Sequence, residues 1–93
     1  MNKQRYGSVW DAIEDTAELA ENFKLRSALM IALERHIHQH ELNQEQAAKL
    51  LGVTQPRISD LLRGKINLFS LDMLVNMVVA AGMHIEMHIS EAA

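Results

Sequence analysis

Apolar side chains recur at helical spacing through the first half of the chain. From Thr16 to His40 no glycine or proline interrupts this spacing, and Thr16 can serve as the N-cap of a helix. The face expected to be buried consists of Leu25, Leu29, Ala32, Leu33, His36 and Ile37, with Phe23 and Met30 beside it. The pattern therefore predicts one long helix over about residues 17–40.

A shorter helix is predicted to begin at Gln44. Asn43 is a suitable N-cap, and Gln46 stands three residues later, which is the spacing of a capping box. Gly52 follows, and glycine readily adopts the positive φ that ends a helix. These residues predict a helix that ends in a tight turn.

A second short helix is predicted directly after this turn. Thr54 or Gln55 can cap it, Pro56 fits its first turn, where the missing N–H costs nothing, and Gly64 ends it. The residues expected to pack between the two short helices are Ala47, Ala48, Val53, Ile58, Leu61 and Leu62. The outward face of the second helix is left with hydrogen-bonding side chains, namely Gln55, Arg57, Ser59, Asp60 and Arg63.

This pair of helices, over residues 44–63, has the spacing of a helix-turn-helix, whose second helix enters the major groove of DNA. Small residues at the crossing, glycine in the turn and a polar outward face occur together, which favours DNA binding over an ordinary helical hairpin. In the loop that follows, Lys65 and Asn67 suit phosphate contacts, and Leu68 and Phe69 are expected to be buried.

The last predicted helix, residues 71–81, is apolar on nearly all sides. Ser70 can cap it, Gly82 ends it, and only Asp72 and Asn76 within it are polar. A helix of this kind is covered on more than one side. A chain of 93 residues has little else with which to cover it, so we expect a second subunit to contact it, with Val78 and Val79 in the interface.

Residues 83–90 alternate strictly between apolar and polar side chains, which predicts a half-buried strand. Met83, Ile85, Met87 and Ile89 face one way, and His84, Glu86, His88 and Ser90 the other. A lone strand leaves its backbone groups unpaired. We therefore expect it to pair with the same strand of a second copy, about a twofold axis; the alternative is addition to the sheet of another protein.

Composition argues against several classes of protein. There is no cysteine, no apolar run long enough to span a membrane and no apolar core of a signal peptide near the N-terminus, so a cytoplasmic location is expected. The net charge of −3 is unusual for a DNA-binding protein. However, residues 23–69 carry seven Lys and Arg against four Asp and Glu, while residues 1–22 and 70–93 each carry a negative surplus of three. Positive charge thus concentrates around the motif, as DNA binding requires.

No enzymatic activity, cofactor or metal is expected. His36 and His40 are four residues apart and could form a bidentate pair, and His84, Glu86 and His88 share a face, but solvated imidazoles account for both patterns. At the N-terminus, the pattern from Ser8 to Ile13 predicts one or two helical turns, in which Trp10 packs on the domain. The alternative is that Tyr6, Val9 and Trp10 anchor a protein partner.

Several segments resemble a known family. Gln44, Ala48, Gly52, Ile58 and Leu61 match the core spacing of the Cro/repressor (XRE) helix-turn-helix family. The segments SVWDAI (8–13), LNQEQAAKLLGVTQPRISDLLRGK (42–65), FSLDML (69–74) and AAGMHIEMHIS (80–90) are similar to small XRE-type regulators known as HigA-like antitoxins. The resemblance covers about residues 8–90.

The resemblance implies which residues contact DNA. The positions that meet base edges hold Gln55, Pro56, Ser59 and Asp60, with Thr54 and Arg57 adjacent to them. The positions that contact phosphates or brace the helix hold Gln44, Arg63 and Lys65. Two residues depart from the pattern, since Pro56 cannot donate to a base and Asp60 repels phosphate unless it accepts from a cytosine amino group or pairs with an arginine. We therefore expect base readout to rest on Gln55, Arg57 and Ser59.

The resemblance also implies a homodimer that binds an inverted repeat in double-stranded DNA and, for antitoxins, a RelE-like ribonuclease toxin as partner. The expected fold is a single domain over residues 1–93, an all-α five-helix XRE-type domain with an N-terminal extension (1–22) and a C-terminal β-strand (83–90) that pairs across the homodimer. The expected function is a repressor, most closely a HigA-like antitoxin acting on its own operon. The alternatives are a stand-alone or phage XRE repressor and a protein-interaction module that neutralises a toxin with little DNA binding.

Overall fold

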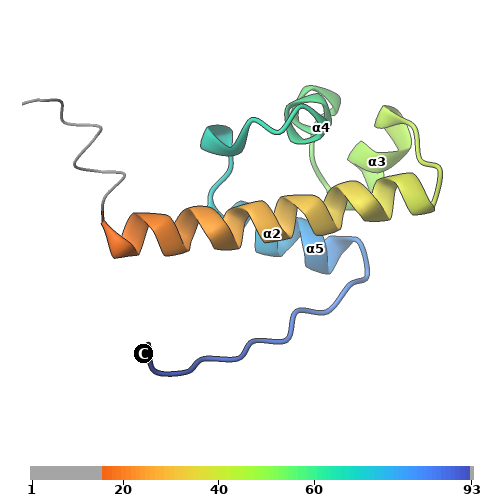
Figure 1. Ribbon diagram of the computed structural model, residues 1–93. Coiled ribbons are helices and arrows are strands. Elements are labelled where there is room, and N and C mark those ends of the chain that lie inside the picture. The colour runs from red at the N-terminus through yellow and green to blue at the C-terminus, as the bar shows by residue number, and fades with distance from the viewer. Residues whose placement is uncertain (1–15, 93) are drawn as a thin grey trace, which may run out of the picture.

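The structure, a computed structural model, describes residues 16–92. Its α-helices are α2 (Ala17–Gln39), α3 (Gln44–Leu51), α4 (Gln55–Leu62) and α5 (Leu71–Ala80), and a short 3₁₀ helix, η2 (Ile66–Leu68), precedes α5. In Figure 1 the long α2 runs through the middle of the molecule, with α3, α4 and η2 on one side and α5 on the other. α2 contacts α4, α5 and η2, and α3 contacts α4 and α5. The other described elements are therefore arranged around α2.

Each α-helix from α2 to α5 begins at a side chain that accepts a hydrogen bond from the first helical turn. Thr16 Oγ1 accepts from the backbone N–H three residues later at 3.2 Å. Asn43 and Gln46 form the predicted capping box, with distances of 2.8 and 2.9 Å. Thr54 caps α4 and Ser70 caps α5. The predicted caps are thus confirmed, and the first of the two candidates for α4 is the one used.

Each described α-helix is followed by a residue with positive φ, which is glycine in three cases and glutamate in the fourth. Gly52 after α3 and Gly64 after α4 have positive φ angles of 71° and 70°, as predicted. After α2 the same left-handed conformation falls on Glu41, whose φ is 53°. It allows the N–H of Leu42 to donate to the carbonyl of Ile37 at 3.0 Å. The Cβ of a non-glycine residue is crowded in this conformation, so Glu41 carries backbone strain.

Replacing Glu41 with glycine is therefore expected to stabilise the fold. Relief of the strain is partly offset by the greater freedom of glycine in the unfolded chain, which leaves a gain of about 0.5–1 kcal/mol. Urea unfolding of the two proteins measures the difference. Glu41→Ala is the matched control, because it removes the same carboxylate but retains a Cβ. An alanine variant as stable as the glycine variant would show that the charge, not the backbone, is responsible.

The core lies where α2, α3, α4 and α5 meet. Its largest fully buried side chains are Leu33, Ile58, Leu74 and Met77. α2 contributes Met30, Leu33 and Ile37, whereas Leu25, which we predicted to be buried, is 47 % exposed. The neighbouring residue, Arg26, is the one that faces the loop after α4, where its guanidinium donates to the carbonyls of Ile66 and Phe69.

The prediction of a five-helix domain with a C-terminal β-strand is wrong. Residues 16–92 form four α-helices and no strand, and the helix predicted after Ser8 lies outside the described residues. Residues 83–92 have no regular secondary structure, because no other described segment supplies the backbone partners of a ladder. Met83 and Ile85 still pack against the core, as their alternation suggested, but as part of an irregular tail.

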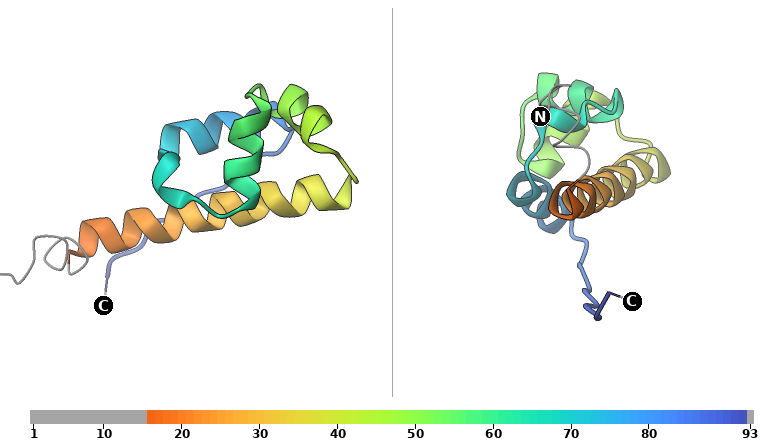
Figure 2. Two further views of the ribbon diagram at one scale, coloured as in Figure 1. Left: turned by 90° about the horizontal axis from the view of Figure 1, so that it is seen from above. Right: turned by 60° about the vertical axis from the view of Figure 1, so that its left-hand side comes forward.

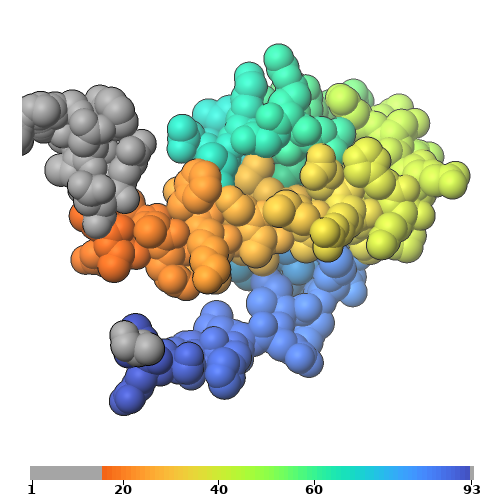
Figure 3. Space-filling view, in the orientation of Figure 1, coloured from red at the N-terminus to blue at the C-terminus, as the bar shows by residue number. Residues whose placement is uncertain are grey.

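In Figure 1 this tail runs back below α2 toward the first turns of that helix, and Figure 2 shows it from two other sides. An open cleft of about 550 Å³ separates the end of the tail from the first turns of α2 (Figure 3). It is lined on one side by Glu21 and Leu25 and on the other by residues 87–92. The tail therefore touches the body of the domain near its start and leaves it toward its end.

Candidate nucleic-acid interface

The site begins with the crossing of α3 and α4. Ala47 and Ala48 are buried where the two helices meet, and Ile58 and Leu61 of α4 are buried against them. The turn is closed by Gly52, whose N–H, like that of Val53, donates to the carbonyl of Ala48. The packing predicted from the sequence, with small residues at the crossing and glycine in the turn, is confirmed.

This packing leaves one face of α4 in contact with solvent. Thr54, Gln55 and Pro56 at its start are exposed, and so are Arg63 and Lys65 just beyond its end. Gln44, at the start of α3, is also exposed. In Figure 3 the side chains of this region stand out from the surface above α2. The short helix thus presents polar side chains at its start, and two cations follow its end.

Asp60 and Arg57 are placed differently from the residues at the helix ends. Arg57 Nη1 and Asp60 Oδ2 are 4.0 Å apart, and the two side chains are 35 % and 24 % exposed. Ser59 is also half-buried. Of the arrangements that would reconcile Asp60 with a phosphate backbone, the structure contains the ion pair with Arg57.

Two arginines hold the loop that carries η2. From α2, Arg26 Nη1 donates to the carbonyls of Ile66 at 3.1 Å and Phe69 at 3.4 Å, while its Nε donates to Asn22 Oδ1 at 2.7 Å. From α4, Arg57 Nη1 donates to a further loop carbonyl at 3.1 Å. Three backbone acceptors of the loop are therefore satisfied by charged donors, which are stronger than neutral ones. Phe69 is buried as predicted, but its neighbour at position 68 is exposed.

The contribution of Arg26 was missed in the sequence. The signal was present, because Arg26 continues the stripe of buried residues on α2, namely Met30, Leu33 and Ile37, at spacings of four, three and four residues. A charged residue in line with a buried stripe indicates a buried acceptor for its charge.

The residues predicted to form a dimer interface fall into three groups. Val78 is 3 % exposed and belongs to the core of its own chain. Met83 and Ile85 are half-buried against that core. Val79, Met87 and Ile89 are exposed. Only the last group is fully available to another molecule.

The histidines near the end of α2 form a ring pair. The ring centroids of His36 and His40 are 4.2 Å apart and the planes are tilted by 51°. Within residues 16–92 there is no group of three or more side chains that could hold a metal ion. No helix of this part of the chain is long and apolar enough to cross a membrane. Tyr6, Val9 and Trp10 lie outside the described residues.

The crossing of α3 and α4, the glycine turn and the exposed polar face of α4 define a helix-turn-helix DNA-binding domain. Comparison with known families agrees, because residues 12–90 match the helix-turn-helix domain family. A solved structure with the name of an XRE family transcriptional regulator superposes with a TM-score of 0.72 at 32 % identity, covering 78 % of this chain and 82 % of that chain. Comparison with curated proteins gives no match. The chain belongs to the XRE-type helix-turn-helix family, a family of DNA-binding transcriptional regulators.

Proposed function

We propose that this protein is a sequence-specific, cytoplasmic repressor that binds an inverted-repeat site in double-stranded DNA as a homodimer. We further propose that it is a HigA-like antitoxin that represses its own operon and binds a RelE-like toxin. The observation that carries the DNA-binding part is the exposed face of α4, with polar side chains at its start and cations beyond its end. The antitoxin part rests on the sequence segments that resemble small XRE-type regulators.

The proposed DNA contacts follow from this geometry. The first turn of a recognition helix meets base edges in the major groove, and exposed cations near it meet phosphates. The proposed surface consists of Gln44, Thr54, Gln55, Pro56, Arg57, Ser59, Asp60, Arg63 and Lys65, within which Arg57 and Asp60 are paired with each other. Its modest positive charge predicts weak non-specific binding by one copy, so two copies on one site would supply useful affinity.

The proposed dimer contact uses the apolar side chains that the single chain leaves exposed. Val79 on α5 is 62 % exposed, and Met87 and Ile89 on the tail are 79 % and 82 % exposed. Burying them against a second copy would remove apolar surface from water. Met83 and Ile85 would border this contact, and Val78 would support it from inside the core.

Selection of binding sites from random DNA duplexes tests the DNA-binding proposal. The expected result is an inverted repeat whose half-sites are centred about one helical turn, or roughly 34 Å, apart. Sedimentation of the free protein and of the complex gives the number of copies. Failure to enrich any sequence would refute sequence-specific binding, and enrichment of a single half-site by a monomer would refute the dimer.

Co-expression with the product of the adjacent gene tests the antitoxin proposal separately. That product alone should arrest growth, and the present protein should restore it. If the product of the adjacent gene does not arrest growth, the antitoxin proposal is wrong and a stand-alone repressor remains.

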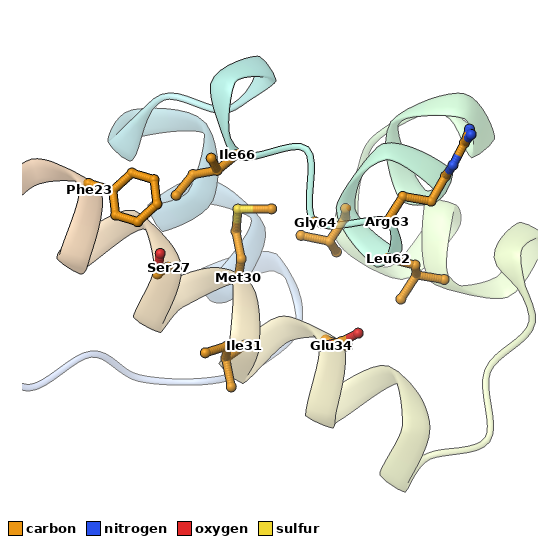
Figure 4. Close-up of a pocket in the computed structure, with 10 residues that line it drawn as sticks. Phe23, Ser27, Met30, Ile31, Glu34, Leu62, Arg63, Gly64 and Ile66 are labelled. Carbon is orange, nitrogen blue, oxygen red and sulfur yellow. The ribbon is translucent and has the colours of Figure 1, made fainter. Parts of the chain in front are cut away.

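A second candidate function is that of a protein-interaction module with little DNA binding. It is favoured by a groove of about 330 Å³ between α2 and the end of α4 (Figure 4). Phe23 and Ile31 of α2 line one side and are about half exposed, and Leu62 and Ile66 line the other. If this function is the correct one, selection from random DNA should yield no site for the wild-type protein. Phe23→Ser should then abolish the ability of the protein to rescue cells from the toxin. If the Phe23→Ser variant still rescues the cells, the groove is not the toxin-binding site.

A further inference from the structure

Arg57 stands on the recognition helix, yet its guanidinium lies against its own chain. Its Nη1 donates to the carbonyl of Leu68 at 3.1 Å, and its Cζ lies 5.4 Å from the centre of the Phe69 ring. The same nitrogen is 4.0 Å from Asp60 Oδ2. The guanidinium of Arg57, which we predicted to read a base, thus lies among a carbonyl, an aromatic face and a carboxylate of its own chain.

Base reading would require Arg57 to give up these contacts. An arginine that reads guanine uses its planar fork in a bidentate contact with O6 and N7. If the Arg57 side chain turned outward, the carbonyl of Leu68 would lose this donor. Asp60 would then stand close to the phosphates of DNA without a positive charge beside it. Phe69, which is 2 % exposed, is fixed in the core and cannot follow the guanidinium.

The contacts of Arg57 join two parts of the proposed DNA-binding surface. Leu68 and Phe69 belong to the loop that also carries Lys65, and Arg26 fixes this loop to α2 from the other side. Arg57 fixes the same loop to α4. Arg57 therefore links α4 directly to the loop that carries Lys65.

We propose that Arg57 is a positioning residue and not a base-reading residue. It holds α4 against the loop of residues 65–69 and compensates the charge of Asp60, so that base reading falls to Gln55 and Ser59. This inference rests on the proposed sequence-specific DNA binding. It assigns Asp60 the role of a compensated carboxylate that anchors Arg57.

The possible roles of Arg57 leave different signatures when it is replaced with methionine, which retains the apolar stem. Loss of a base-reading arginine would relax the preference at one base pair by roughly 5- to 150-fold. Loss of a phosphate contact would lower the slope of log affinity against log salt by about 0.9 per half-site. Loss of a positioning residue is expected to weaken binding to the selected site about tenfold, with the preferred base at every position unchanged.

Binding-site selection and salt titration with the full chain distinguish these roles. Arg35→Met is the matched control, because Arg35 is an exposed arginine on α2 and its loss changes the net charge equally. Arg57→Lys, which retains a charge and a donor for the loop carbonyl, should keep most of the affinity. Asp60→Asn added to Arg57→Met should restore part of the loss, because it removes the uncompensated carboxylate. Thermal melting confirms that each variant is folded at the temperature of the assay.

The outcomes separate this inference from the proposed function. If the wild type selects no sequence, the proposed function fails. If the wild type selects a site and Arg57→Met changes the preferred base at one position, the positioning role is overturned. A fall in salt slope of about 0.9 per half-site relative to Arg35→Met would overturn it as well, in favour of a phosphate contact. If adding Asp60→Asn to Arg57→Met restores no affinity, Arg57 does not act by compensating the charge of Asp60.

Discussion

Replacing both Arg63 and Lys65 with alanine should weaken DNA binding about 60-fold per half-site at 0.1 M salt. Each protein–phosphate contact releases condensed counterions and contributes about 0.9 to the slope of log affinity against log salt. Two lost contacts per half-site therefore lower the slope by about 1.8 for each bound copy, which at 0.1 M salt corresponds to this factor. Both residues are exposed at the end of α4, so their removal should leave the fold intact. Titration of a labelled DNA duplex at several salt concentrations measures the affinity and the slope together.

The matched control removes the same charge from another part of the surface. Lys24 and Arg35 are exposed on α2, and the variant Lys24→Ala with Arg35→Ala should change affinity only slightly, through the weaker long-range field. Equal losses in the two double variants would mean that net charge alone governs binding. In that case Arg63 and Lys65 would not be local phosphate contacts.

Replacing Ile58 with alanine should cost about 2–5 kcal/mol of the free energy of unfolding. Ile58 is fully buried between α4 and the rest of the core, and a truncation there leaves a cavity in addition to the lost transfer energy. Small domains have only about 5–15 kcal/mol in total. Urea unfolding followed by far-UV circular dichroism gives the difference, and DNA binding should fall in step with the folded fraction.

Ile31 supplies the comparison for this prediction. It is the same residue type within a helix, but 47 % of it is exposed, so Ile31→Ala should change stability by no more than about 0.5 kcal/mol. Similar effects of the two substitutions would show that Ile58 is not the tightly packed residue described above.

The helix-turn-helix could be predicted because its sequence signals are local. The capping box of Asn43 and Gln46, the glycine turn at Gly52 and the buried positions of α4 each depend on residues within a few positions of one another. These features follow from helical geometry alone. The predicted outward face of α4 was correct only in part, because Gln55 and Arg63 are exposed whereas Arg57, Ser59 and Asp60 are half-buried.

What could not be predicted depends on contacts between distant parts of the chain. Arg26 donates to a carbonyl 40 residues away, and nothing local to either residue reveals the other. The buried face of α2 was predicted with Leu25 at its start, whereas Arg26 is the residue that turns inward, because the loop offers it acceptors. Arg57 was given to DNA for the same reason, since its loop carbonyl lies 11 residues further along the chain.

The prediction of a C-terminal strand was wrong for a different reason. Alternation reports which side chains face a surface, but a strand also needs a neighbouring backbone to receive its hydrogen bonds. Met83 and Ile85 obey the alternation and contact the core, while no described segment lies alongside to complete a ladder. The pattern was therefore informative about side chains and misleading about secondary structure.

The recognition helix has only eight residues, and helices shorter than about 12–15 residues are marginal in water on their own. It owes its shape to Ile58 and Leu61, which anchor it, and to α2, which contacts it from below. The proposed DNA-binding surface is consequently present only in the folded domain, and it is lost whenever the domain unfolds. A molecule that displaced α2 would switch this surface off without ever touching α4.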